Sequence, residues 1–180
     1  MAIDGSFRQD QDQQPMFSHL DGEGRPRMVD VSGKPETLRT ALAEGWVILD
    51  RAVCEQLAAD GYSKKGDVLK IAETAGIMAV KKTPELIPLC HGIRIERAEV
   101  KCIFLEETAR IRITCTVAAR DVTGVEMEAL TGVSVAALTV YDMCKGISKN
   151  MIIEGIHLLK KTGGKSGTYI AEGMNGNADS

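Results

Sequence analysis

The sequence contains few aromatic residues, and this scarcity limits what the protein can bind. Phenylalanine, tyrosine and tryptophan together make up 4% of its 180 residues. An RNA-binding sheet stacks bases on exposed aromatic rings, and the chain has no cluster of aromatics for that purpose. Apolar residues still make up 44%. The core must therefore be built from aliphatic side chains and methionine.

The chain also lacks a strong positive charge. Its formal net charge is -3 at pH 7, and its pI is about 5.7. A dedicated nucleic-acid-binding domain is strongly basic, so this balance excludes that class. It does not exclude a local basic pocket in an acidic protein.

Cysteines are too irregularly spaced for a disulfide framework or a zinc site. The chain has five cysteines, three histidines and no C-x-x-C pair. An odd number of scattered cysteines is typical of a protein from a reducing compartment. A structural zinc site needs four cysteine or histidine ligands at short spacings. We therefore expect no metal-ligating residues and no cofactor, while the sequence does not decide whether magnesium helps to hold phosphate groups.

Neither a membrane span nor a signal peptide is predicted. No apolar run is long enough to cross a bilayer, and residues 1–14 are polar. These absences predict a soluble cytoplasmic protein. The chain length suits one domain with a proper core. We expect this domain at residues 21–168, with flexible polar tails at 1–20 and 169–180.

Hydrophobic periodicity predicts an α+β domain. Strand-like runs cover residues 36–49, 94–106, 110–121 and 151–161, and helical runs cover 52–59, 67–82 and 123–147. Asp67 is expected to cap the second helix, and Thr123 and Glu126 have capping-box spacing in the third. Without the short first helix, the order is βαββαβ. This is the order of a ferredoxin-like fold, an antiparallel sheet packed by helices.

The third predicted helix carries a charged face. At 100° per residue, its members are Glu128, Asp142, Lys145 and Lys149. A solvated face with ion pairs at i, i+3 and i, i+4 is one interpretation. Val135 and Leu138 lie in the same sector, however, and the neighbours of Asp142 are apolar. This pattern indicates partial burial, and a buried amine can carry protons near neutral pH.

Distance constrains how this face can work. Glu128 and Asp142 are fourteen residues apart, or about 21 Å along a helix. They cannot both contact one small reacting centre. Either the ligand is long, or two subunits each contribute one end of this helix to a shared pocket. Glu126 faces a different direction and can cap its own helix, so Glu128 is the better ligand-binding candidate.

A loop histidine and a lysine at a helix start are further candidates. His91 lies in the Pro/Gly-bracketed connection 86–92, and histidine titrates near neutral pH, although a structural role is the alternative. Cys90 is either a reactive thiol or a small buried apolar residue. Lys65 precedes Asp67 at a helix start, where backbone amides favour an anion. An exposed loop lysine would give the same pattern.

The glycine-rich stretch 163–167 has the composition of a phosphate-binding loop. The P-loop pattern needs a glycine five residues before Gly164, where Leu159 stands. The stretch is therefore not a P-loop, but with Lys161 and Lys165 it can still bind phosphate. A flexible basic chain end is the alternative. Lysines near several turns of an acidic chain indicate a polyanionic ligand in a focused pocket.

Four long segments carry the most specific pattern. They are MVDVSGKPET (28–37), KKGDVLKIAETAGIMAVKKTPELIPLCH (64–91), TGVEMEALTGVSVAALTVYDMCK (123–145) and LLKKTGGKSG (158–167). These segments resemble the cyclic pyranopterin monophosphate synthase family, known in bacteria as MoaC. The resemblance extends from Met28 to about Gly167. It implies a ferredoxin-like subunit in a homohexamer of three dimers, with pockets at the subunit interfaces.

The resemblance also implies a reaction. The family consists of lyases that convert 3′,8-cyclo-7,8-dihydroguanosine 5′-triphosphate to cyclic pyranopterin monophosphate and release diphosphate, in molybdenum cofactor biosynthesis. By position, Asp142, Lys65 and Lys145 match its acid–base residues, and His91 is expected to orient the substrate or relay a proton. The expected substrate-binding positions are Leu89, Cys90, His91, Met127, Glu128, Glu126, Arg39, Lys81, Lys161 and Lys165. Gly92 stands where the family often has proline, which loosens the loop but removes no reacting group.

Two other functions remain open at the sequence level. One is a non-catalytic ferredoxin-like module that binds a nucleotide or another ligand. The other is a nucleotide hydrolase that releases phosphate from ordinary GTP.

Overall fold

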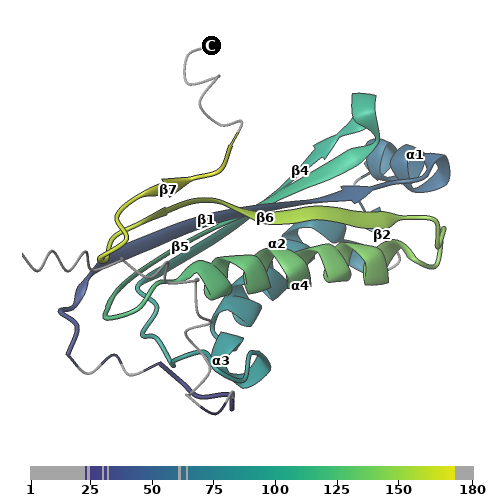
Figure 1. Cartoon of the computed structure of the whole chain (residues 1–180). Helices are drawn as coiled ribbons and strands as arrows, with labels where there is room; N and C mark the ends of the chain where they lie inside the picture. Colours follow the sequence, from purple (N-terminus) through teal and green to yellow (C-terminus); the bar gives the residue numbers. More distant parts are fainter. Residues whose placement is uncertain are drawn as a thin grey trace, which may run out of the picture.

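The computed structural model describes residues 23, 25–29, 31, 33–60, 62–63 and 65–172. An antiparallel sheet in the order β4-β5-β1-β6-β7 carries α2 and α4 on one face (Figure 1). The elements are β1 (Thr37–Ile48), α1 (Arg51–Asp60), β2 (Tyr62–Ser63), β3 (Gly66–Asp67), α2 (Val68–Val80), α3 (Thr83–Leu86), β4 (Arg97–Leu105), β5 (Arg110–Asp121), α4 (Glu126–Cys144), β6 (Ile152–Thr162) and β7 (Tyr169–Ile170). A 3₁₀ turn, Glu106–Thr108, joins β4 to β5.

The predicted α+β, ferredoxin-like fold is confirmed. The order β1-α2-β4-β5-α4-β6 is the expected βαββαβ, with α1 inserted before α2. β1 lies at the centre of the sheet, between β5 and β6. Among the described residues, no helix is long and apolar enough to cross a membrane.

β5 illustrates how the sequence places the core on one face. Successive side chains of a strand point to opposite faces. The buried set consists of Ile111, Ile113, Cys115, Val117 and Ala119. Arg110, Arg112, Thr114 and Thr116 alternate with it and lie on the opposite face. The strand occupies Arg110–Asp121, as predicted.

The two long helices pack closely because glycine stands where they cross. A Cβ atom on Gly76 of α2 would lie 2.9 Å from the carbonyl oxygen of Gly132 on α4. Such a contact would force the helices apart. α2 begins as predicted, since the Asp67 side chain accepts a hydrogen bond from the backbone N–H of Lys70.

α4 differs from the sequence prediction at both ends. It covers Glu126–Cys144 rather than 123–147, and its N-cap residue, Val125, makes no side-chain cap. The predicted capping box of Thr123 and Glu126 is therefore wrong, because α4 begins at Glu126 itself, whose side chain forms an ion pair with Lys161. Lys149 lies beyond the end of α4 and does not belong to a helical face.

Four short elements were not predicted, namely β2, β3, α3 and β7. α3 precedes the loop that carries His91, and β7 occupies two positions placed in the expected C-terminal tail. β7 forms because its backbone pairs with β6, and the adjacent Ala171 N–H donates to the Leu159 carbonyl at 2.8 Å. The expected tail at 1–20 and the remaining positions 173–180 lie outside the described residues.

Candidate active site

Lys65, Asp142 and Lys145 meet at the C-terminal end of α4 and form a lysine–aspartate triad. Lys65 comes from the connection between β2 and β3, and its Nζ lies 2.5 Å from Asp142 Oδ2. It also donates to the main-chain carbonyl of Asp142 at 2.9 Å. Lys145 Nζ lies 2.7 Å from Asp142 Oδ1. Each carboxylate oxygen therefore has its own ammonium group.

The triad is exposed, which corrects the expectation of partial burial. The three side chains are 51–53% exposed. Hydrogen bonds from Lys145 and then Lys65 hold the pKa of Asp142 at about 2. Asp142 in turn raises the pKa of Lys145. Lys145 is therefore held as a cation at neutral pH and is a weaker acid than a buried amine, whose pKa would be lowered.

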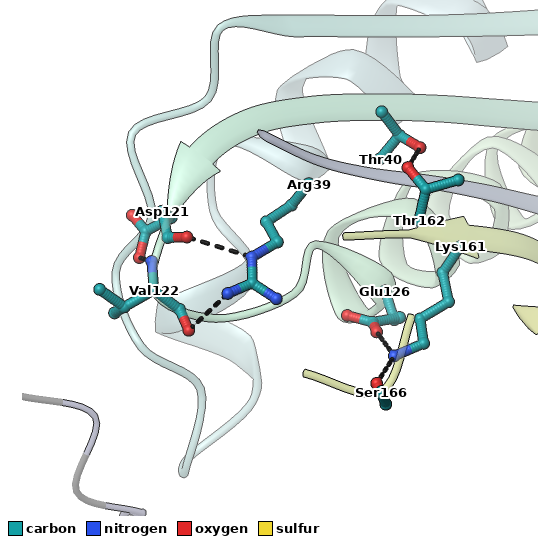
Figure 2. Close-up of polar contacts among 8 residues, drawn as sticks. All are labelled: Arg39, Thr40, Asp121, Val122, Glu126, Lys161, Thr162 and Ser166. Carbon is teal, nitrogen blue, oxygen red and sulfur yellow. Dashed lines mark hydrogen bonds and ion pairs between the residues drawn. The ribbon is translucent and has the colours of Figure 1, made fainter. Parts of the chain in front are cut away.

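A second group of charges lies at the other end of α4 and lines a cavity of about 400 Å³. Its cations are Lys34, Arg39, Lys161 and Lys165. We call this space the basic cavity. Glu126 Oε1 lies 3.6 Å from Lys161 Nζ, which also donates to Ser166 Oγ at 2.5 Å (Figure 2). Four cations against one carboxylate give the lining a positive charge suited to phosphate groups.

Arg39 is the most firmly held cation of the basic cavity. It is 9% exposed. Its Nε and Nη2 atoms each donate at 3.1 Å, to the backbone carbonyls of Asp121 and Val122 respectively (Figure 2). A Cβ atom on Gly164 would lie 1.6 Å from Arg39 Nη1, so only glycine lets the turn close over the guanidinium. The sequence requires glycine here for contact with Arg39, not for a P-loop.

Glu128, in the first turn of α4, is a buried carboxyl group. It is 1% exposed, and neither carboxylate oxygen has a hydrogen-bond partner among the described residues. Burial raises its pKa to about 7, and the nearby charges of Glu126 and Asp121 add to the shift. A buried polar group without a partner is unfavourable, so Glu128 is poised to accept one from a ligand.

The loop with Cys90 and His91 lies near this end of α4. Burial raises the pKa of the Cys90 thiol, and the charges of Glu128 and Glu126 raise it further. Cys90 is thus a neutral, partly buried thiol rather than a reactive thiolate. His91 Nε2 lies 3.0 Å from the Val29 carbonyl oxygen. Because a carbonyl only accepts, Nε2 carries the proton and Nδ1 is the acceptor in neutral His91.

Within one chain, the candidate residues do not form a single cluster. The triad and the first turn of α4 remain about 21 Å apart along the helix. Leu89 and Met127 are half-buried beside Cys90 and Glu128 in sequence. Lys81 lines another cavity, of about 420 Å³, which shares no lining residue with the basic cavity.

Sequence reasoning did not single out two residues of the basic cavity, Lys34 and Ser166. Both lie inside the segments that carry the family resemblance, at 28–37 and 158–167. The available signal was a lysine beside Gly33 and a hydroxyl in a glycine-rich turn. Such residues often surround phosphate, but only the fold shows that the two segments meet.

Comparison with known proteins identifies the family of this chain. A family model described as the MoaC family matches residues 28–164. The chain belongs to the MoaC family. The matched segment contains the triad, Glu128, the His91 loop and three cations of the basic cavity, and leaves out Lys165.

Several curated relatives of this MoaC-family chain are similar over most of its length. A protein from Corynebacterium glutamicum is 53% identical over 153 residues, which is 85% of this chain and 96% of the relative. One from Peptoclostridium acidaminophilum is 49% identical over 158 residues, 88% of this chain and 99% of the relative. Both are named cyclic pyranopterin monophosphate synthase. Molybdenum cofactor biosynthesis protein 1 of Drosophila melanogaster is 49% identical over 160 residues, 89% of this chain and 28% of the relative.

Proposed function

We propose that this chain is a cyclic pyranopterin monophosphate synthase. It converts 3′,8-cyclo-7,8-dihydroguanosine 5′-triphosphate to cyclic pyranopterin monophosphate and releases diphosphate, as a lyase of molybdenum cofactor biosynthesis. Relatives about 50% identical over almost their whole length carry this name. The observation that best supports the chemistry is the triad, in which two ammonium groups share one carboxylate.

The basic cavity provides the phosphate-binding part of the site. Arg39, Lys161 and Lys165 can each contact phosphate oxygens, and Glu126 keeps Lys161 in place by an ion pair. Lys81 lies on a separate cavity and binds a more distant part of the ligand in this proposal.

The first turn of α4 and the His91 loop provide the part that binds the purine-derived ring. Glu128 offers the ring N–H groups two carboxyl oxygens that have no partner within the described part of the chain. Leu89, Cys90 and Met127 surround the ring with partly buried, mostly apolar surface. His91 presents its unprotonated Nδ1 for orienting the substrate or relaying a proton.

The triad performs the proton transfers of ring opening and reclosure. Lys145 is a cation at neutral pH and donates the first proton in this proposal, although the pKa that Asp142 raises lowers the driving force for that transfer. Asp142 remains ionised at neutral pH and holds both amines in position. Lys65 is paired with the other carboxylate oxygen of Asp142, and it accepts or donates the second proton.

A pocket shared between subunits reconciles this chemistry with the distance between the triad and the ring-binding residues. Within one chain, about 21 Å separates Asp142 from Glu128. In the proposed homohexamer of three dimers, the triad of one subunit faces the ring-binding residues of its neighbour. The assembly works in the cytoplasm.

The test is turnover of the authentic triphosphate by the purified chain, followed by chromatography of the product and assay of diphosphate. We expect Lys65→Ala, Lys145→Ala and Asp142→Asn each to lower kcat by about 10²–10⁴-fold. Arg51→Gln is the matched control, because it breaks an exposed ion pair with Glu55 on α1, outside the site.

Each alternative gives a different result. An unchanged nucleotide would indicate a binding module, and phosphate release from GTP would indicate a hydrolase. If Lys65→Ala and Lys145→Ala keep turnover within a few-fold of the unmodified chain, the proton-transfer roles are wrong.

A further inference from the structure

The connection from α4 to β6 determines where the Lys145 ammonium group lies. Lys145 is the C-cap residue of α4, and its N–H donates to the Tyr141 carbonyl. The next firmly buried residue is Met151. The intervening residues 146–150 are exposed except for Ser148, which is half-buried. Packing therefore holds this turn only at its two ends and near Ser148.

Ser148 is attached to the centre of the fold by Asp50. Its hydroxyl donates to Asp50 Oδ2, and its Oγ accepts a hydrogen bond from the backbone N–H of Asn150 at 3.2 Å. The hydrogen bond from Ser148 lowers the pKa of Asp50, so the acceptor is a carboxylate. Hydrogen bonds to a charged group are roughly twice as strong as neutral ones.

Asp50 is a firm anchor for this turn. It lies two residues after the end of β1, the strand between β5 and β6. Its other oxygen, Oδ1, accepts the N–H of Val53 at 3.2 Å and so caps α1. One carboxylate thus connects the central strand, the start of α1 and the turn that follows Lys145.

The turn after Lys145 is held both by the Asp50–Ser148 hydrogen bond and by the Tyr141 hydroxyl, which donates to the Lys149 carbonyl at 3.2 Å. The triad side chains are about half exposed, and helix ends fray when their last turn is not held. The Ser148 and Ile147 N–H groups both donate to the Cys144 carbonyl, so movement of Ser148 is transmitted to the last turn of α4.

We propose that Asp50 and Ser148 are positioning residues, whose hydrogen bond holds the α4–β6 turn so that the Lys145 ammonium stays on Asp142. This role rests on the proposed function of the triad. Neither residue contacts the substrate, and both act through Lys145.

The test uses variants that separate this hydrogen bond from the cap of α1. Ser148→Ala removes the hydroxyl. Asp50→Ser keeps a side chain that caps α1 as well as aspartate does, but it is too short to reach Ser148. A displacement of about 1 Å can cost up to about 10²-fold in rate, and we expect kcat to fall by about 5–20-fold in either variant. We expect KM to change by less than about 2-fold, because the ring and phosphate contacts are intact.

Two comparisons distinguish positioning from a general loss of stability. Ser148→Thr retains the hydroxyl and should restore kcat to within about 2-fold of the unmodified chain. The double variant Asp50→Ser with Ser148→Ala should be no slower than either single variant, since both remove one interaction. We expect Tm to fall by no more than about 4 °C in each single variant.

A second readout is independent of turnover. The carboxyl carbon of Asp142, followed by NMR over pH, reports its ion pairs directly. We expect Ser148→Ala to move the pKa of Asp142 upward from about 2, towards its value in Lys145→Ala, and Ser148→Thr to leave it in place. If the unmodified chain has no activity, the proposed function fails, and this titration still tests the positioning role.

Three results would overturn the inference. The first is a Ser148→Ala enzyme with kcat and an Asp142 titration equal to those of the unmodified chain. The second is a Ser148→Thr variant as impaired as Ser148→Ala. The third is a double variant whose defect equals the product of the two single defects.

Discussion

Glu128 is a carboxyl group in a place where its ionised form is unfavourable. It is buried, its oxygens have no partner among the described residues, and its pKa is about 7. In the unfolded chain a glutamate titrates near 4.3. Between these values the folded state holds a proton that the unfolded state has released. The contribution of Glu128 to the free energy of unfolding is therefore highest at low pH. It declines as the pH rises from the pKa of the unfolded chain through about 7, the pKa of the folded chain.

Replacing Glu128 by glutamine should remove this pH dependence. Glutamine has a similar shape and no charge to desolvate. At pH 8 we expect Glu128→Gln to have a free energy of unfolding about 1–3 kcal/mol above that of the unmodified chain. At pH 5 the difference should be much smaller. The measurement is urea unfolding at several pH values and one protein concentration.

Glu55→Gln is the matched control for this experiment, because Glu55 is exposed on α1 and pairs only with Arg51 in the described part of the chain. Its curve of stability against pH should run parallel to that of the unmodified chain. Parallel curves for Glu128→Gln as well would show that Glu128 is already ionised in the folded protein at neutral pH.

The turn after β6 is an element whose conformation depends on glycine. Gly163 has a φ of +92°, a region that other residues rarely adopt. A Cβ atom there would lie 2.3 Å from the Leu38 carbonyl oxygen, a backbone atom of β1 that cannot move aside. The same turn carries Lys165 and Ser166 of the basic cavity. Its shape thus serves both packing and phosphate binding.

Gly163→Ala should therefore weaken both the fold and the site. We expect the free energy of unfolding to fall by about 1–3 kcal/mol from backbone strain and the contact with Leu38. KM should rise because Lys165 moves away from the phosphates. Denaturant unfolding and steady-state kinetics measure the two effects.

Gly33→Ala is the control for this element, since a Cβ atom on Gly33 meets nothing within 4 Å and its φ is not positive. Its stability should stay within about 0.5 kcal/mol of the unmodified chain, as for most surface substitutions. Equal stability of Gly163→Ala and Gly33→Ala would mean that the turn relaxes without strain.

At the scale of the whole molecule, the sheet has one face packed by α2 and α4 and an opposite face that presents its own side chains. Residues paired across neighbouring strands share a face, and the register places Ile103, Arg112, Trp46 and Glu154 in one row.

The charges on this open face of the sheet are largely paired. The guanidinium groups of Arg110 and Arg112 lie 6.0 Å and 5.8 Å from the centre of the Trp46 ring. Arg112 also pairs with Glu44, so much of the charge on this face is neutralised. Such a surface is suited to contact with another copy of the chain.

Ile103→Glu should disrupt the proposed assembly. Ile103 is 47% exposed in the isolated subunit, and a carboxylate there would be desolvated in a contact between two copies. We expect the unmodified chain to have the mass of a hexamer in light scattering after size exclusion, and Ile103→Glu to give smaller species. Ala58→Glu adds the same charge to the exposed side of α1 and should keep the hexamer. A monomeric unmodified chain would contradict the shared pocket, and a hexameric Ile103→Glu would exclude this face from the interface.

Features governed by neighbours in the chain were predictable. The alternation of apolar and polar residues predicted where β5 begins and ends, because burial of one face of a strand imposes a period of two. The cap of α2 by Asp67 depends on an N–H three residues away. The family segments indicated the candidate site residues without the fold, but only the fold shows which of these residues meet.

Contacts between distant parts of the chain were decided only by the tertiary structure. Lys65 is 77 residues from Asp142, and Arg39 is 82 residues from the Asp121 carbonyl that it binds. β7 exists because β6 offers a partner, and α4 starts at Glu126, three residues later than its capping pattern suggested. The exposure of Asp142 and the burial of Glu128 have the same origin. Periodicity determines which side of a helix a residue occupies, but the elements packed against that side decide how much water reaches it.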